Sequence, residues 1–178
     1  MMPATPSAAE ITAAIRNVPD FPKPGIQFKD ITPVLADARL FSGAIDLLIE
    51  NFRPGSVDAV VGIDARGFIF AAAAAVKLHA GFIPVRKKGK LPYQTIEQDY
   101  ALEYGSATVA IHTDALKPGS RVLLIDDLLA TGGTAAAAAA LVKKLGGQIL
   151  EASFLIELKF LNGREKLKGQ EVRSLISY

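Results

Sequence analysis

The sequence predicts an α/β fold in which a parallel, twisted sheet is flanked by helices. Short apolar runs at residues 59–63, 81–85 and 121–126 have the length and composition of strands that are buried on both faces. The first two runs are joined by a turn and an alanine-rich segment of helical length, residues 68–79, which gives a strand–helix–strand order. With 178 residues, half of them hydrophobic, the chain is long enough for one domain with a substantial core, and we expect a single domain over residues 1–178.

Capping residues and prolines in the N-terminal third of the sequence predict helices and a rigid loop. Ser7 and Glu10 have the spacing of a capping box, so a helix is expected over residues 7–17. Prolines stiffen a loop at residues 21–26, and a second helix is expected over residues 38–52, where an Arg-Pro-Gly sequence follows.

A more polar region follows the second buried strand. Residues 90–116 contain two stretches of alternating polarity, at 100–104 and 108–112, which predict a mobile loop that leads into an antiparallel hairpin. The remaining expected elements are a helix, a strand and a last edge strand, at residues 134–145, 149–156 and 172–176.

Composition excludes several classes of protein. The chain has no cysteine, which rules out a disulfide scaffold and a cysteine nucleophile and fits a reducing compartment. The formal net charge of +2 gives no indication of a nucleic-acid partner. The longest apolar run, residues 68–76, is far shorter than the roughly 20 residues that a membrane span needs. The N-terminus also lacks the basic and apolar regions of a secretory signal, so we expect a cytoplasmic protein without a membrane or nucleic-acid partner.

The most informative motif lies where the third buried strand is expected to end. Asp126 and Asp127 close the apolar run, and Thr131-Gly132-Gly133-Thr134 follows at the start of a helix. Glycines let backbone N–H groups approach an anion closely, the first turn of a helix favours negative charge, and Thr134 can cap that helix. Two carboxylates that can hydrogen-bond a diol therefore precede a phosphate seat, which suits a phosphorylated ribose.

Two common nucleotide-binding signatures are missing from the sequence. A Gly-x-x-x-x-Gly-Lys-Ser/Thr loop does not occur, which excludes a P-loop nucleotide triphosphatase. No Gly-x-Gly-x-x-Gly segment follows a predicted strand, which argues against a dinucleotide enzyme. The two histidines, His79 and His112, stand far from the motif and from each other, and we interpret both as structural.

Residues 122–134 closely resemble the phosphoribosyl diphosphate (PRPP) motif of the type I phosphoribosyltransferases. The turn Asp64-Ala65-Arg66-Gly67 resembles the pyrophosphate loop of that family. Three further segments resemble the base-covering loop, the catalytic loop and the C-terminal motif of its adenine-specific branch, at residues 21–33, 101–105 and 161–167. The resemblance implies the type I fold, with a small N-terminal hood at about residues 1–35 and a flexible loop and hairpin at about 90–116.

The resemblance also implies a reaction. Its adenine-specific branch is a group of pentosyl-transferring glycosyltransferases that move the 5-phosphoribosyl group of PRPP to N9 of adenine, giving AMP and diphosphate in purine salvage. Mg²⁺ would be held mainly by PRPP, so no side chain is assigned as a metal ligand. The substrates would be adenine and PRPP, and the protein would be a homodimer.

The implied residue roles form four groups. Glu103 would be the general acid that donates a proton to N7 of adenine. The PRPP ribose and 5-phosphate would be bound by Asp126, Asp127, Ala130, Thr131, Gly132, Gly133 and Thr134. The diphosphate would be bound by Ala65, Arg66, Arg86, Lys87 and Lys90, the last three reaching into the neighbouring subunit's site. The base would be held between Ile26 and Phe28, and read by backbone groups near Ile26 and Leu158.

Two alternatives stay open at this point. The first is a transferase for another base, such as hypoxanthine, xanthine or orotate, which a panel of bases in a spectrophotometric assay would separate. The second is a PRPP-sensing regulator that binds nucleic acid. About 20 residues precede the core, which is too few for a helix-turn-helix domain, and a gel-shift titration with PRPP would test this alternative.

Overall fold

The computed structural model describes residues 5–102 and 105–178, and the chain divides into two compact units, Met1–Leu47 and Leu48–Tyr178. The first unit is longer than the expected hood of about 35 residues. Residues of the helix after position 38 explain the difference, because they pack on the N-terminal segment. Arg39 forms an ion pair with Glu10, and a Cβ at Gly43 would lie 2.1 Å from the Pro6 ring.

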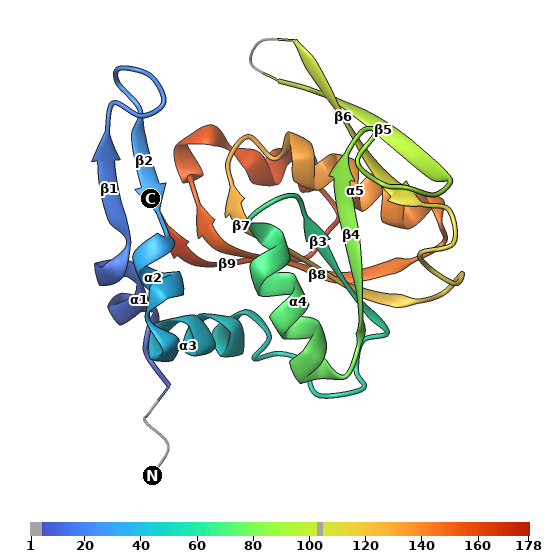
Figure 1. Ribbon diagram of the computed structural model, residues 1–178, viewed down its shortest axis with the longest axis horizontal. Helices are drawn as coiled ribbons and strands as arrows, with labels where there is room; N and C mark the ends of the chain where they lie inside the picture. The colour runs from blue at the N-terminus through green and yellow to red at the C-terminus, as the bar shows by residue number, and fades with distance from the viewer. Residues whose placement is uncertain (1–4, 103–104) are drawn as a thin grey trace. The chain divides into compact units, whose positions relative to one another are not determined.

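The first unit consists of three helices and a two-stranded hairpin (Figure 1). Its elements are α1 Ala8–Ala14, β1 Arg16–Pro19, β2 Gln27–Asp30, α2 Thr32–Ala36 and α3 Ala38–Leu48, which ends at the unit boundary. The capping box is confirmed: the Ser7 N–H donates to Glu10 Oε2 at 2.9 Å, and the Glu10 N–H donates to Ser7 Oγ at 3.3 Å. The prediction that this helix reaches residue 17 is wrong, because β1 pairs with β2 and takes Arg16 and Asn17 into the hairpin.

The second unit contains a seven-stranded sheet in the order β5-β6-β4-β3-β7-β8-β9. The strands are β3 Ala59–Ile63, β4 Gly81–Lys87, β5 Thr95–Ala101, β6 Ser106–His112, β7 Arg121–Leu129, β8 Gln148–Glu157 and β9 Val172–Ser177. Five strands, β4, β3, β7, β8 and β9, run parallel to one another. Strand β6 is antiparallel to both of its neighbours, β4 and β5. The predicted parallel sheet, the hairpin and the edge strand at the C-terminus are confirmed.

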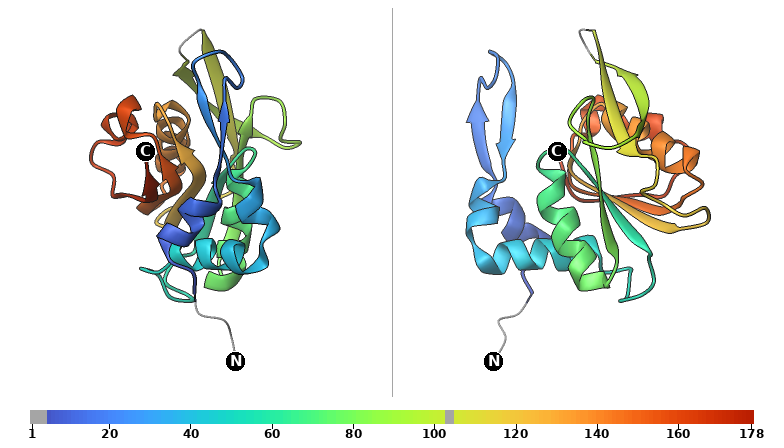
Figure 2. Two further views of the ribbon diagram at one scale, coloured as in Figure 1. Left: turned by 90° about the vertical axis from the view of Figure 1, so that its left-hand side faces the viewer. Right: turned by 45° about the vertical axis from the view of Figure 1, so that its right-hand side comes forward.

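Helices α4 Gly67–Leu78 and α5 Gly133–Lys144 cover opposite faces of this sheet (Figures 1 and 2). A Cβ at Gly62 of β3 would lie 2.7 Å from Ala71 of α4, so this face of β3 packs directly on that helix. The neighbouring Val61 points the other way, into a fully buried cluster with Leu124 and Ala138 of α5. Small alanine side chains let both helices lie close to the strands.

The hairpin β5–β6 differs in extent from the prediction. Strand β5 begins at Thr95, within the segment that was expected to be a mobile loop, and Figure 2 shows the hairpin extending past the parallel strands. The ladder of β5 with β6 runs from Thr95 to Ala101, and the Thr108 hydroxyl donates to Asp99 Oδ1 at 2.6 Å. The short 3₁₀ segments η1 Lys159–Leu161 and η2 Gly163–Leu167 connect β8 to β9. None of the described helices is long and apolar enough to cross a membrane.

Candidate active site

The paired carboxylates lie inside β7 and not at its end. The prediction that this strand stops at residue 126 is wrong, because β7 stays paired with β8 as far as Leu129. Its pairing with β3 ends at Ile125, the partner of Gly62. Asp126 therefore stands where one neighbouring strand has stopped and the other continues. This one-sided ending opens the sheet beside both carboxylates, at the edge where α/β sheets bind ligands.

The two carboxylates have different surroundings. Burial, and then the neighbouring charge of Asp127, raise the pKa of Asp126 well above its ordinary value. Asp127 is 7% exposed and accepts a hydrogen bond from Arg66 Nε at 2.5 Å. The Asp127 N–H in turn donates to Asp126 Oδ1 at 2.9 Å. The pair is thus held by one cation and one backbone donor, with carboxylate oxygens left to accept from a diol.

The turn after β3 packs against these carboxylates. A Cβ at Gly67 would lie 2.5 Å from Asp126 Oδ1 and 3.2 Å from the Ile125 carbonyl oxygen, so only glycine fits at the start of α4. The peptide bond between Asp64 and Ala65 is cis. The close contact places Ala65 and Arg66 beside Asp127, although they precede it by about 60 residues in the sequence.

A cavity of about 400 Å³ joins the pyrophosphate turn to the PRPP motif. Its lining brings together residues that the sequence assigned to one substrate: Asp64, Ala65, Arg66, Lys87, Asp126, Asp127, Ala130 and Thr134, with Ile63 and Leu128. Cations and carboxylates share its wall, which suits a ligand that carries both phosphate groups and hydroxyls.

The basic run is only partly directed at this cavity. The prediction placed it just after a strand, whereas Arg86 and Lys87 are the last residues of β4 and pair with Ala110 and Val109 of β6. Lys87 lines the cavity of its own chain. Arg86 donates from Nε to Asp64 Oδ2 at 3.3 Å and from Nη1 to the Lys90 carbonyl oxygen at 2.9 Å. It therefore stabilises the loop that follows β4.

A second, smaller hollow of about 70 Å³ lies at the start of α5. It is lined by the PRPP motif itself: Asp126, Leu128, Leu129, Ala130, Thr131, Gly132, Gly133, Thr134 and Ala135. The prediction that Thr134 caps the helix is wrong. Gly132 is the N-cap residue, with φ of 77°, and it has no side chain to bond the first turn. The hollow thus lies at the N-terminal end of α5, where the N–H groups of the first turn have no acceptor within the helix and can bind an anion.

The C-terminal motif supports this hollow from behind. A Cβ at Gly132 would lie 2.2 Å from the Gly163 carbonyl oxygen, and a Cβ at Gly163 would lie 2.3 Å from the Ala130 carbonyl oxygen. Two glycines thus let the two loops touch backbone to backbone. Arg164 beside them grips Glu157 with both Nε and Nη2, at 2.7 and 2.8 Å, and this contact lowers the pKa of the Glu157 carboxyl. Residue types alone do not reveal this pairing, because Glu157 and Arg164 lie in different elements, β8 and η2.

The residues expected to contact adenine fall in different units. Ile26 and Phe28 belong to the first unit, where Ile26 is 43% exposed and Phe28 packs edge-on against Phe21 at 5.1 Å between ring centroids. Leu158 belongs to the second unit, and its N–H donates to the Leu129 carbonyl oxygen at 2.9 Å. Glu103, the expected general acid, lies outside the described residues.

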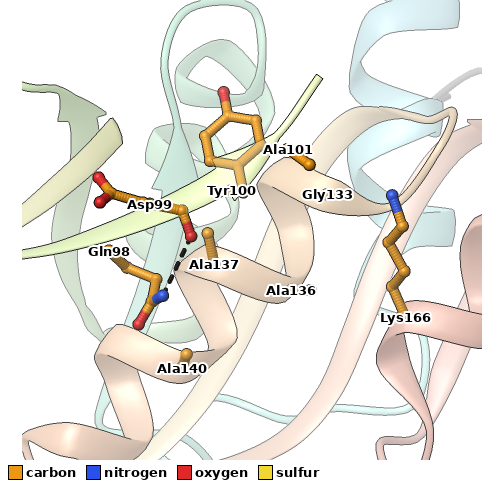
Figure 3. A pocket seen from close by; sticks show the side chains of 9 residues that line it. All are labelled: Gln98, Asp99, Tyr100, Ala101, Gly133, Ala136, Ala137, Ala140 and Lys166. Atoms are coloured by element: carbon orange, nitrogen blue, oxygen red, sulfur yellow. Dashed lines mark hydrogen bonds between the residues drawn. The ribbon is translucent and has the colours of Figure 1, made fainter. Parts of the chain in front are cut away.

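A cavity of about 350 Å³ lies between β5 and α5, apart from the expected substrate residues except Gly133 (Figure 3). Alanines of α5 form its floor, Gln98 and Asp99 line one wall, and Lys166 points toward Gly133 from the other. Its mixed polar and alanine lining does not carry the paired carboxylates or the diphosphate cations.

Comparison with known proteins decides the family. The phosphoribosyl transferase domain matches residues 30–172 of the chain. An adenine phosphoribosyltransferase from Acidothermus cellulolyticus is 54% identical over 175 residues, which cover 98% of this chain and 99% of the relative. The chain belongs to the adenine phosphoribosyltransferase family.

Solved members of the adenine phosphoribosyltransferase family share the fold. The crystal structure from Rhodothermus marinus is similar with a TM-score of 0.91 and 51% identity, covering 96% of this chain and 98% of that one. The Saccharomyces cerevisiae enzyme, solved with D-2,5-dideoxy-2,5-imino-altritol 1,6-bisphosphate and adenine, has a TM-score of 0.89 and 42% identity, covering 94% and 97%. The predicted family and fold class are therefore confirmed.

Proposed function

We propose that this protein transfers the 5-phosphoribosyl group of PRPP to N9 of adenine, giving AMP and diphosphate. The observation that carries the proposal is the cavity in which the Arg66–Asp127 pair meets the phosphate hollow at the start of α5. Family membership supplies the reaction. We propose that the ribose hydroxyls bind at Asp126 and Asp127, the 5-phosphate at Ala130–Thr134, and the diphosphate near Ala65, Arg66 and Lys87; the linings of the cavity and the hollow support this arrangement.

The proposed chemistry separates charge at the ribose. Breaking the C1–diphosphate bond creates positive charge on the sugar and negative charge on the leaving group. The Arg66 guanidinium and the Lys87 ammonium can stabilise that negative charge, and backbone N–H groups at Gly132 and Gly133 hold the far end of the substrate. Fixing both ends of PRPP restricts the motion of C1 relative to the attacking base.

Magnesium enters the proposal as a companion of PRPP. In the part of the chain that the structure describes, no three His, Cys, Asp or Glu side chains are grouped to hold a metal. The carboxylate oxygens of Asp126 and Asp127 would suit a hard cation that PRPP brings with it. When bound, Mg²⁺ would neutralise part of the diphosphate charge.

The base side of the reaction rests on the family. We propose that Ile26 and Phe28 hold the adenine ring, and that backbone groups near Ile26 and Leu158 read its amine. An exposed Ile26 beside an aromatic pair is a suitable surface for a flat base. Adenine loses its one imidazole proton when N9 bonds to C1, so we propose that Glu103 is the acid–base residue at N7 and takes up that proton. Loop closure would favour this role, because desolvation raises the pKa of a glutamate.

We also propose a cytoplasmic homodimer in which Lys90 of the basic run serves the site of the neighbouring subunit, whereas Lys87 lines the site of its own chain. A dimer would give a role to Lys90, which does not line the cavity of its own chain. Sedimentation velocity at micromolar concentration tests this part, and a monomer alone would refute it.

The experiment for the function is AMP formation from adenine and PRPP with Mg²⁺, followed for the wild type and Glu103→Ala. We expect turnover with adenine that exceeds turnover with hypoxanthine, guanine or orotate, and a loss of about 10²-fold in the variant. The control is Glu97→Ala, which removes a carboxylate of β5 that forms an ion pair with Lys88. No turnover with any base would refute the proposed reaction, and full activity of Glu103→Ala would refute the role of Glu103 alone.

A further inference from the structure

Arg164 is the centre of a hydrogen-bond network at the carboxyl end of β8. Its Nε and Nη2 donate to the two oxygens of Glu157 at 2.7 and 2.8 Å. Its Nη1 donates to the Val172 carbonyl oxygen at 2.8 Å, and Nη2 also reaches Ser174 Oγ at 3.0 Å. The Ser174 hydroxyl donates to Glu157 at 2.5 Å. A planar guanidinium satisfied on three sides fixes one orientation of the segment that carries it.

The carboxylate in this network is a rigid anchor. The Glu157 side chain is only 4% exposed, and its backbone pairs on both sides, with Leu129 of β7 and with Ser177 of β9. Arg164, in contrast, sits on a short 3₁₀ segment that follows Asn162, a residue with φ of 52°. Because Glu157 cannot move without disturbing the sheet, the ion pair positions the 3₁₀ segment and not the reverse.

The segment that Arg164 fixes is the one that touches the phosphate hollow. Gly163, its direct neighbour, leaves no room for even a Cβ against the Ala130 carbonyl oxygen or the Gly132 backbone. Lys166, two residues on, has its ammonium nitrogen 3.8 Å from where a Cβ at Gly133 would be. Any shift of this segment would therefore push or release the backbone at Ala130–Gly133.

The same anchor also borders the base side. Leu158 follows Glu157 directly, and its N–H bonds to the carbonyl oxygen of Leu129, the residue before Ala130. Glu157 thus joins the backbone proposed to read adenine to the loop proposed to hold the 5-phosphate.

We infer that Arg164 is a positioning residue which, through Glu157 and Gly163, holds the loop Ala130–Thr134 in the shape that binds the 5-phosphate of PRPP. The inference rests on the proposed phosphate seat. A residue with this role strengthens the binding of the 5-phosphate equally in the ground state and in the transition state. Its loss therefore raises KM for PRPP with little change in kcat. A purely structural residue would lower the fraction of folded enzyme, and hence the apparent kcat, at unchanged KM.

The chain contains a matched control for this test. Arg121 also grips a carboxylate with two nitrogens, since Nε and Nη2 donate to Asp58 at 3.2 and 2.8 Å, and Nη2 also donates to a backbone carbonyl oxygen. It stands at the first residue of β7, at the end of the strand away from the site. Arg164→Lys and Arg121→Lys therefore each remove a two-nitrogen contact between a guanidinium and a carboxylate, at opposite ends of the same sheet.

The experiment measures KM for PRPP, kcat, and the affinity for ribose 5-phosphate by calorimetry. For Arg164→Lys we expect KM and the ribose 5-phosphate Kd to rise about tenfold with kcat within twofold, because losing one hydrogen bond to a charged phosphate weakens binding by about that factor. Arg121→Lys should change the melting temperature and leave both constants unchanged. Ser174→Ala, which removes the two hydrogen bonds of the Ser174 hydroxyl and keeps the ion pair, should give a smaller rise in KM and serves if Arg164→Lys does not fold.

Thr131→Asp separates the inference from the seat on which it rests. Thr131 is exposed, so a carboxylate there is tolerated by the fold but repels a phosphate. Loss of ribose 5-phosphate binding in Thr131→Asp, with unchanged binding in Arg164→Lys and Ser174→Ala, would overturn the positioning role alone. Unchanged binding in Thr131→Asp would overturn the seat, and the inference with it.

Discussion

Replacing Gly163 with alanine tests the contact between the C-terminal motif and the phosphate loop. The added Cβ would lie 2.3 Å from the Ala130 carbonyl oxygen, 3.1 Å from the Gly132 nitrogen and 3.1 Å from a Leu129 methyl. Ordinary contact begins near 3.4 Å, so the two backbones must separate by about 1 Å. The nearest atom, the Ala130 carbonyl oxygen, and the Gly132 nitrogen belong to the backbone, so a rotamer change of Leu129 cannot relieve the strain.

The expected magnitude follows from this overlap. Overpacking of this kind costs about 1–3 kcal/mol, which for a chain of this size lowers the melting temperature by about 2–10 °C. Moving the loop by about 1 Å should also raise KM for PRPP by tenfold or more. Both values are measured directly, by thermal unfolding of the ligand-free protein and by initial rates at varied PRPP.

Gly81→Ala is the control for that variant. Gly81 begins β4, and the nearest atom to an added Cβ is the Asp58 carbonyl oxygen at 3.7 Å, so both the melting temperature and KM should stay near wild type. The reasoning is refuted if Gly163→Ala binds PRPP as the wild type does, because the two loops would then not constrain each other.

Three further variants test the electrostatics and the helix start. Asp126→Asn should raise the melting temperature of the ligand-free protein at pH 7 while weakening PRPP binding, because burial and Asp127 raise the pKa of Asp126 and make its charge unfavourable. The stability gain should shrink as the pH falls through the raised pKa and disappear below the ordinary value of 3.8, where the wild-type carboxyl is protonated in the folded and the unfolded state; a gain that persists well below that pH would contradict this account. Arg121 lowers the pKa of Asp58 to about 2 from 3.8, so the stability that Asp58 contributes should be present above pH 4 and lost between pH 4 and 2. Melting curves of wild type and Asp58→Asn should therefore converge toward pH 2, and a constant difference would argue against the ion pair. Thr134→Val should change stability by less than about 0.5 kcal/mol, since Gly132 and not Thr134 caps α5; a larger loss would restore the capping role.

Local signals in the sequence were sufficient for most of the fold. The apolar run at 59–63 became β3 with the same bounds, and the Ser7–Glu10 capping box formed as its spacing indicates. Both depend on residues within a few positions of each other. The PRPP motif was equally local, and this explains why the family expectation was confirmed.

The errors arose where distant segments decide the structure. Strand β7 runs past Asp126 because β8 supplies a partner as far as Leu129, and no pattern within β7 reports on β8. Strand β5 starts at Thr95 because its ladder with β6 reaches that residue. The Glu157–Arg164 pair could not be recognised either. The Arg164 guanidinium is held in place by further hydrogen bonds to Val172 and Ser174 of β9, and no pattern near Arg164 in the sequence indicates them.

The pairing of Arg66 with Asp127 has a consequence for how a charged substrate is received. Arg66 neutralises Asp127 before PRPP binds. When PRPP binds, Arg66 therefore exchanges one anionic partner for another in addition to forming new contacts. An exchange displaces fewer counterions than the number of cations in the cavity suggests. The affinity for PRPP should therefore depend on ionic strength less steeply than two independent cations, Arg66 and Lys87, would require.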